Sequence, residues 1–203
     1  MLVQKRKGVQ KMSKFFKSAW FKCTLVLLII AVVSGSLISI LSNVLYVSDQ
    51  ERTARAIKKI YGQEKEFDIL IDTDKGDDAI EYDFGKIDKI YTVGEDTLFM
   101  ATGYNGYKNG TITVWVKVVK DGDHNKIDKI ILQTYDKQTL MSKLGNDYYN
   151  TFLVDATDAY LNGQDFTTEQ GEPLVNLVSG ATKSANAGNN AVNCVIKYLG
   201  ENA

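Results

Sequence analysis

A stretch of small and hydroxyl-bearing residues near the C-terminus is the part of the chain best suited to chemistry. It reads Asn-Leu-Val-Ser-Gly-Ala-Thr-Lys-Ser over residues 176–184, directly before a predicted helix. Ser179 and Gly180 would let a ligand approach the backbone closely. The free N–H groups of a first helical turn favour a phosphate, and the Thr182 hydroxyl would lie beside it. The alternative is that Thr182 only caps the helix, because Ser and Thr are common caps.

The sequence offers few residues that could support other catalytic or metal chemistry. His124 is the only histidine, so Ser-His-Asp catalysis, Cys-His catalysis and zinc sites lack their usual partners. Cys23 and Cys194 are too far apart for a metal site and are not expected to form a disulfide. Residues 121–125 resemble the start of a calcium loop but lack its later Gly and Glu, so we expect a hairpin turn. For the acids between 72 and 81 a solvated loop is favoured over calcium, and we predict no catalytic residue and no metal site.

Charge is distributed unevenly along the 203 residues. Residues 1–22 carry seven bases and no acid, residues 23–47 carry no charge, and residues 48–203 carry 17 bases and 25 acids, a net charge of −8. The uncharged run exceeds the roughly 20 residues that cross a bilayer as a helix. Because the first bases all precede it, we expect the N-terminus in the cytoplasm and residues 48–203 outside. A cleaved signal peptide is the alternative, but the run is long and no small-residue cleavage site follows it.

The composition of the outer part limits its partners. An acidic domain is unsuited to nucleic acid, which is bound by neutralising phosphates with Lys and Arg. Other membrane proteins are suitable partners, because the apolar run has a face of small residues through which helices pack in a bilayer, formed by Ser34, Gly35, Ser36, Ser39 and Ser42.

The segment after the apolar run is predicted to begin with a helix and to continue as a connection. Residues 48–62 begin with Ser48 or Asp49, either of which is a suitable cap, and end at a glycine. Residues 63–86 show no clear period. We therefore assign residues 48–86 to a juxtamembrane helix and its connecting segment.

The remainder, residues 87–203, is predicted to form an α+β domain. Alternating apolar residues separated by polar turns indicate an antiparallel meander with strands over residues 87–93, 97–104, 111–119 and 127–135. Residues 139–153 are expected to form short helices and residues 154–175 to be mostly loop. A terminal helix with one apolar stripe is predicted over residues 183–200. The predicted fold class is one N-terminal transmembrane helix followed by an antiparallel-sheet domain with a C-terminal helix.

The hydroxyl-bearing stretch and its setting resemble one known family. Ser-Gly-Ala-Thr followed by x-Ser, opening the last helix, is similar to the attachment motif of the FMN-binding domain family. Members include the G subunit of Rnf-type ferredoxin:NAD oxidoreductases and the C subunit of sodium-pumping NADH:quinone oxidoreductases. The membrane helix, the juxtamembrane helix, the Gly-Tyr stretch at 103–107 and the strand pair at 109–135 are also similar. The chain departs from the family at Asn176, where Asp is usual, and at 135–145, which lacks a Pro-Gly loop.

The resemblance implies a covalent flavin. FMN would be joined to Thr182 by a phosphoester bond that a flavin transferase installs. Apart from the resemblance, several aromatic residues could stack on its ring, and we expect Tyr135 or its neighbours there; the others are Tyr104, Tyr107, Trp115, Tyr148 and Tyr149. The cofactor-binding residues are then Thr182, Ser179, Gly180, Ala181, Ser184, Asn176 and Tyr135.

The function that follows from the resemblance is electron transfer. The chain would be the electron-carrying subunit of a membrane-bound redox complex, together with other membrane subunits, and not an independent enzyme. Two alternatives stay open: a membrane-anchored binding or adhesion module without a cofactor, and a stand-alone extracellular electron shuttle.

Overall fold

The N-terminal unit contains one long apolar helix. The computed structural model describes residues 19–45, 48–145, 148–164 and 178–202, and the chain divides into compact units Met1–Glu51 and Arg52–Ala203. Helix α2 (Ala19–Leu45) includes the apolar segment Trp20–Leu41, none of which is buried against the protein. At about 1.5 Å per residue this segment spans roughly 33 Å, enough for a bilayer core of about 30 Å. A helix long and apolar enough to span a membrane is therefore present where one was predicted, and it begins four residues before the uncharged run.

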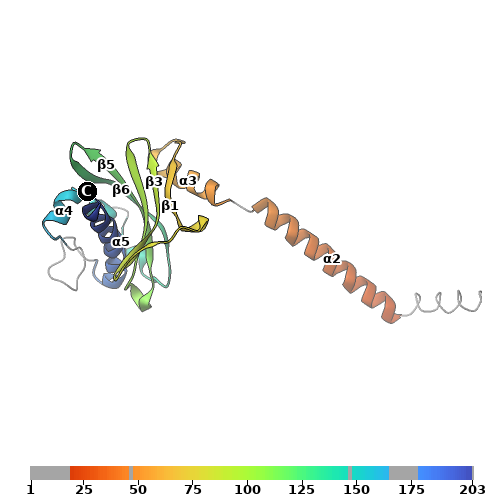
Figure 1. The fold of residues 1–203 in the computed structure, drawn as a ribbon. Coiled ribbons are helices and arrows are strands. Elements are labelled where there is room, and N and C mark those ends of the chain that lie inside the picture. The colour runs from red at the N-terminus through yellow and green to blue at the C-terminus, as the bar shows by residue number, and fades with distance from the viewer. Residues whose placement is uncertain (1–18, 46–47, 146–147, 165–177, 203) are drawn as a thin grey trace, which may run out of the picture. The chain divides into compact units, whose positions relative to one another are not determined.

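The second unit is built on an antiparallel sheet of six strands, shown in Figure 1. The strand order is β1-β3-β4-β5-β6, with β2 also paired to β3. The strands are β1 (Asp68–Asp72), β2 (Ile80–Tyr82), β3 (Gly85–Val93), β4 (Asp96–Gly103), β5 (Ile112–Asp121) and β6 (His124–Tyr135). The four predicted strands and the α+β class are confirmed.

One expectation for the connections is wrong. Residues 63–86 are not merely a connection, because β1 and β2 both pair with β3. β1 is largely exposed at the sheet edge, and its pairing with β3 shifts register after Ile69, so its sequence lacks a clean alternation. Residues 154–175, predicted to be mostly loop, include the short helix α4 (Ala156–Leu161), which is too short to show a helical period. Residues 165–175 of that loop lie outside the described residues.

Short helical segments also occur where they were predicted. The 3₁₀ turns η3 (Met141–Lys143) and η4 (Tyr148–Phe152) lie within 139–153. Two further 3₁₀ turns, η1 (Thr73–Lys75) and η2 (Tyr107–Asn109), lie in connections between strands.

The terminal helix α5 (Thr182–Glu201) packs on one face of the sheet. Its predicted stripe faces β4 and β5, and Ala187, Ala191 and Val195 are fully buried there. The backbone of α5 passes very close to β4. A Cβ atom at Gly103 would lie 1.9 Å from the Ala187 carbonyl oxygen, so only glycine fits at the end of this strand.

Helix α3 (Asp49–Tyr61) covers the opposite face. It starts where predicted, since the Glu51 N–H donates to the Ser48 hydroxyl at 3.2 Å, and it ends before Gly62, which has a φ of 75°. The buried residues of α3 pack against strand residues on this face, while the residues adjacent to these along each strand face α5. This second core consists of Ala56, Ile57, Ile60, Tyr91, Val93, Leu98 and Trp115.

A buried ion pair lies at the β1–β3 edge. The Lys89 ammonium is 3.0 Å from a carboxylate oxygen of Asp72 and also contacts Asp74. The Tyr91 hydroxyl donates to the other Asp72 oxygen at 2.7 Å and lies 3.4 Å from the hydroxyl of Thr53 in α3. Burial alone would raise the pKa of Asp72, but the hydrogen bonds from Tyr91 and Lys89 outweigh it and lower the pKa below its ordinary value. The acids near residue 72 are therefore partly structural.

Replacing the buried lysine should test this pair. Lys89→Met leaves the Asp72 carboxylate buried without its cation, so the free energy of unfolding at pH 7 should fall by about 3–5 kcal/mol. Because the pKa of Asp72 is lowered in the folded protein, its ionised carboxyl stabilises the wild type at pH values above the ordinary carboxyl pKa. This stabilisation is lost as pH falls, so the difference in unfolding free energy between the wild type and Lys89→Met should narrow towards pH 3. Urea unfolding of the full chain, followed by Trp115 fluorescence, measures both effects.

A surface lysine provides the control. Lys126→Met breaks the exposed contact between Lys126 and Asp121 and should change stability far less. An equal loss in both variants, or a difference that does not depend on pH, would contradict the structural role of the Asp72–Lys89 pair.

Candidate functional site

Thr182 is the first residue of α5 and does not cap it. The N-cap position is occupied by Ala181, which has no side chain that can accept a hydrogen bond. The Thr182 side chain is exposed, whereas Ala181 before it is buried. The interpretation of Thr182 as a helix cap is therefore wrong, and its hydroxyl remains accessible at the helix start.

The first turn of α5 presents backbone N–H groups. The Ala185 N–H donates to the Ala181 carbonyl at 2.9 Å and closes the first turn. The N–H groups of residues 182–184 precede this bond and have no acceptor within the helix. With the positive end of the helix dipole, they form a suitable environment for a phosphate.

A cleft of about 310 Å³ opens beside this turn. Ligand pockets start at roughly 300 Å³, so the cleft has room for part of a cofactor. It is lined by Tyr107, Thr139, Leu140, Gly180, Ala181, Thr182, Lys183 and Ser184. The structure thus brings four of the predicted site residues together with residues from a distant loop.

A second cation lies next to the helix start. Gly180 has a φ of 80°, and a Cβ atom added to it would lie 2.7 Å from the Lys143 ammonium. Lys143 comes from η3 and is exposed, and Lys183 follows Thr182 directly. One ammonium group therefore lies at Gly180, and a second lysine lines the cleft directly after Thr182, in a domain that is acidic overall.

Ser184 has a structural contact of its own. Its buried hydroxyl donates to the side-chain oxygen of Gln138 at 2.7 Å. The same oxygen accepts the Tyr107 N–H at 3.1 Å, while the Gln138 amide nitrogen donates to the Asp136 carbonyl at 2.8 Å. Gln138 therefore joins the end of β6, the 104–110 connection and the first turn of α5.

The aromatic residue at the cleft differs from the one expected. Tyr135 lies at the end of β6, is 48% exposed and does not line the cleft. Tyr107 lines it and is 38% exposed, with the Lys108 ammonium 5.4 Å from its ring centre. Ser179 is exposed in the turn before α5, and Asn176 lies outside the described residues.

Two residues of this site, Gln138 and Lys143, were not predicted from the sequence. They lie about 40 to 45 positions before Thr182 in the chain, and no short motif connects them with it. Tyr107 was one of several aromatic residues considered for the ring contact. The run of Gly and Tyr at 103–107 was the one available signal, because it is part of the resemblance to the FMN-binding domain family.

Comparisons with known proteins identify no relative. No family model matches the chain, and neither curated proteins nor solved structures include a match to it. Assignment to the FMN-binding domain family therefore stays a prediction that rests on the motif and its setting.

The contact of Ser184 gives a testable distinction between the hydroxyls near the cleft. Ser184→Ala removes one of the two donors to the Gln138 oxygen and should lower the free energy of unfolding by about 1 kcal/mol. Covalent flavin, if carried on Thr182, should be retained. Urea unfolding and in-gel flavin fluorescence measure the two effects, and Ser179→Ala, at an exposed position, should change neither. Loss of flavin from folded Ser184→Ala protein would contradict this expectation and show that attachment requires the Ser184 hydroxyl.

Proposed function

We propose that this chain is a membrane-anchored flavoprotein subunit that carries FMN on Thr182 for electron transfer in a membrane redox complex. The observation that carries the proposal is the accessible Thr182 hydroxyl, which lies in a cleft at the start of α5 and does not serve as a cap. A threonine without a capping role, in a motif that resembles a flavin-attachment site, favours covalent chemistry at its hydroxyl.

The surroundings of Thr182 fit a phosphate that bears a negative charge. The N–H groups of the first turn would donate to its oxygens, and the ammonium groups of Lys143 and Lys183 would offset its charge. Gly180 keeps the approach open because it has no side chain, and its φ of 80° is one that other residues rarely adopt. Gln138 holds Ser184 and hence the orientation of the turn that presents Thr182.

The flavin would supply the redox chemistry, and the chain would position it. Tyr107 lines the same cleft as Thr182 and would be the aromatic contact of an attached ring, in place of Tyr135. Electrons would pass between the flavin and cofactors of partner subunits, so the chain acts as a carrier and not as an independent enzyme.

The membrane helix gives the proposed subunit its location. α2 is long and apolar enough to cross a bilayer once. The seven bases before it favour a cytoplasmic N-terminus and place the sheet domain on the outer side. The helix would pack against other membrane subunits of the complex.

The attachment residue can be tested by three matched variants made together with a flavin transferase. Thr182→Ala should abolish covalent flavin, whereas Thr182→Ser, which keeps a hydroxyl, should retain at least part of it. Because Thr182 is exposed and does not cap α5, the alanine variant should keep its stability within about 0.5 kcal/mol. Thr139→Ala, which changes another threonine of the same cleft, should keep the flavin. In-gel fluorescence after denaturing electrophoresis and intact mass measure the attachment.

Two outcomes would contradict the proposal. Flavin retained by Thr182→Ala would show that another residue is attached. Wild-type protein without flavin, made beside an active transferase, would remove the redox function and leave a membrane-anchored binding module.

The orientation in the membrane can be tested separately. A tag at the C-terminus should be digested by protease added to intact spheroplasts, while a tag before Lys5 should be protected, because the bases of residues 1–22 hold the N-terminus inside. Protection of the C-terminal tag would reverse the topology and place the sheet domain in the cytoplasm.

A further inference from the structure

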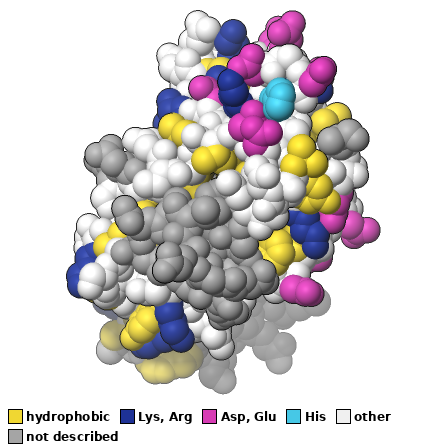
Figure 2. Space-filling view, turned by 90° about the vertical axis from the view of Figure 1, so that its left-hand side faces the viewer, with side chains coloured by type: hydrophobic (Ala, Val, Ile, Leu, Met, Phe, Trp, Pro, Cys, Tyr) yellow, Lys and Arg dark blue, Asp and Glu magenta, His cyan; other side chains and the backbone are white. Residues whose placement is uncertain are grey.

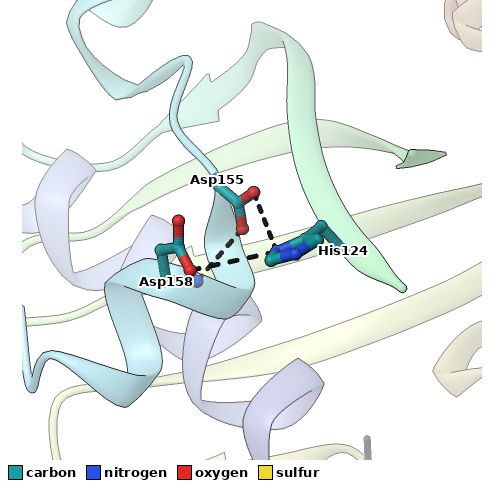
Figure 3. Close-up of side chains that lie close together, drawn as sticks. All are labelled: His124, Asp155 and Asp158. Atoms are coloured by element: carbon teal, nitrogen blue, oxygen red, sulfur yellow. Dashed lines mark hydrogen bonds and ion pairs between the residues drawn. The ribbon is translucent and has the colours of Figure 1, made fainter. Parts of the chain in front are cut away.

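The only histidine of the chain lies beside two aspartates. His124 is the first residue of β6, Asp155 precedes α4, and Asp158 lies in its first turn. Figure 3 shows the three side chains pointing towards one another, and one donor atom from each lies within 4.8 Å of the others. In Figure 2 the histidine is at the surface with acidic side chains around it. We propose that these residues form a binding site for a divalent transition-metal ion of the Zn²⁺ type.

The spacing of the donors fits a shared cation. The Nδ1 atom of His124 lies 3.3 Å from an oxygen of Asp155 and 3.8 Å from an oxygen of Asp158. Both separations exceed the usual hydrogen-bond range of about 2.7–3.2 Å. Ligands on a tetrahedral zinc ion with bonds of about 2.1 Å lie roughly 3.4 Å apart. A small shift of the exposed Asp158 side chain brings all three onto one ion.

The donor types indicate which metal would bind. One imidazole nitrogen and two carboxylate oxygens suit Zn²⁺ and its first-row neighbours, whereas Mg²⁺ and Ca²⁺ favour oxygen ligands alone. Water would complete the coordination on the exposed side.

The backbone fixes the two halves of the site. Asp155 uses its other oxygen, Oδ1, to accept the Asp158 N–H at 3.0 Å, which orients the oxygen that faces His124. The hairpin end is held to α4 by the Asn125 N–H, which donates to the Thr157 hydroxyl at 2.9 Å, and by the Ile127 N–H, which donates to the Val154 carbonyl at 3.0 Å. The site is therefore assembled before metal binds.

Charges near the site leave it negative. Lys126 contacts Asp121 and so does not occupy the gap between the aspartates. Asp123 lies in the adjacent hairpin turn and carries the same charge, but it is not one of the three proposed ligands. This neighbour provides a matched control.

The proposed metal site is separate from the cleft beside Thr182. A Cβ atom at Gly200 would lie 2.1 Å from the Tyr160 ring, which places α4 beside the C-terminal end of α5. Thr182 begins the same helix, which extends for about 30 Å. A bound metal would link the β5–β6 hairpin to α4 and stabilise the domain without taking part in flavin attachment.

Zinc titration of the full chain tests the proposal. The protein is purified in detergent without a histidine tag, treated with EDTA, and titrated with ZnCl₂ by calorimetry. We expect saturable binding of one Zn²⁺ per chain, about tenfold or more weaker in His124→Ala and in Asp158→Asn. Asp123→Asn should bind as the wild type does. Zn²⁺ should raise the melting temperature of the wild type and of Thr182→Ala equally, but not that of His124→Ala.

Three results would overturn the proposal. Absence of saturable binding in the wild type would show that His124 forms ion pairs only. Unchanged affinity in His124→Ala would place the zinc elsewhere. Equal weakening in Asp123→Asn and Asp158→Asn would show a diffuse acidic surface instead of a site. Both aspartate variants carry exposed substitutions and Asp155 remains as the cap of α4, so folding is maintained.

Discussion

The close approach of α5 to β4 is the constraint on which the rest of the domain depends. Gly103 has no room for a side chain, because the Ala187 carbonyl oxygen and the Ala191 nitrogen lie where its Cβ would be. A larger residue would move the helix outward and open the core between Ala187, Val195 and the sheet. The same approach brings the first turn of α5 beside the 104–110 connection, where a Cβ at Gly106 would contact Ala187. The position of Thr182 therefore follows from backbone packing further along the helix.

Buried polar contacts then separate two hydroxyls that are similar in sequence. Ser184 is buried and needs a partner, which Gln138 provides, because an unsatisfied buried polar group is costly. Thr182 is two residues earlier, lies on the solvent side and does not cap the helix. One hydroxyl thus holds the helix start in place, and the other stays available for chemistry. The division results from the orientation of α5 and not from the properties of Ser and Thr.

The opposite face of the sheet connects the domain to the segment that follows the membrane helix in sequence. Ile57 and Ile60 of α3 pack against Trp115, and Thr53 reaches the Tyr91 hydroxyl next to Asp72. The buried Asp72–Lys89 pair lies at the strand β1 that the sequence analysis missed. Apolar packing on this face is supplemented by a polar network, which fixes α3 at one position on the sheet.

The sequence by itself determined the elements whose signals are local. Hydropathy along the chain predicts α2, and alternation predicts β5 and β6, because burial on one side of a helix or strand repeats at short and regular intervals. The same local signals predict the start of α3 at Ser48 and the stripe of α5. Edge strand β1 and short helix α4 were not predicted, since β1 is largely exposed and its pairing with β3 shifts register, and α4 has less than two turns.

Only the tertiary structure decided the composition of both candidate sites. Residues 176–184 mark Thr182 in the sequence, but the packing of α5 on the sheet brings other residues to its turn. Tyr107 lines the same cleft, Gln138 contacts Ser184 and Lys143 lies at Gly180. The sequence likewise predicts no metal site, because His124 is about 30 positions from Asp155 and no periodic signal relates them. They meet because β6 begins at the hairpin end that docks on α4. Short-range sequence patterns indicate which side of one helix or strand is buried. Contacts between different elements depend on how their backbones pack, which these patterns do not indicate.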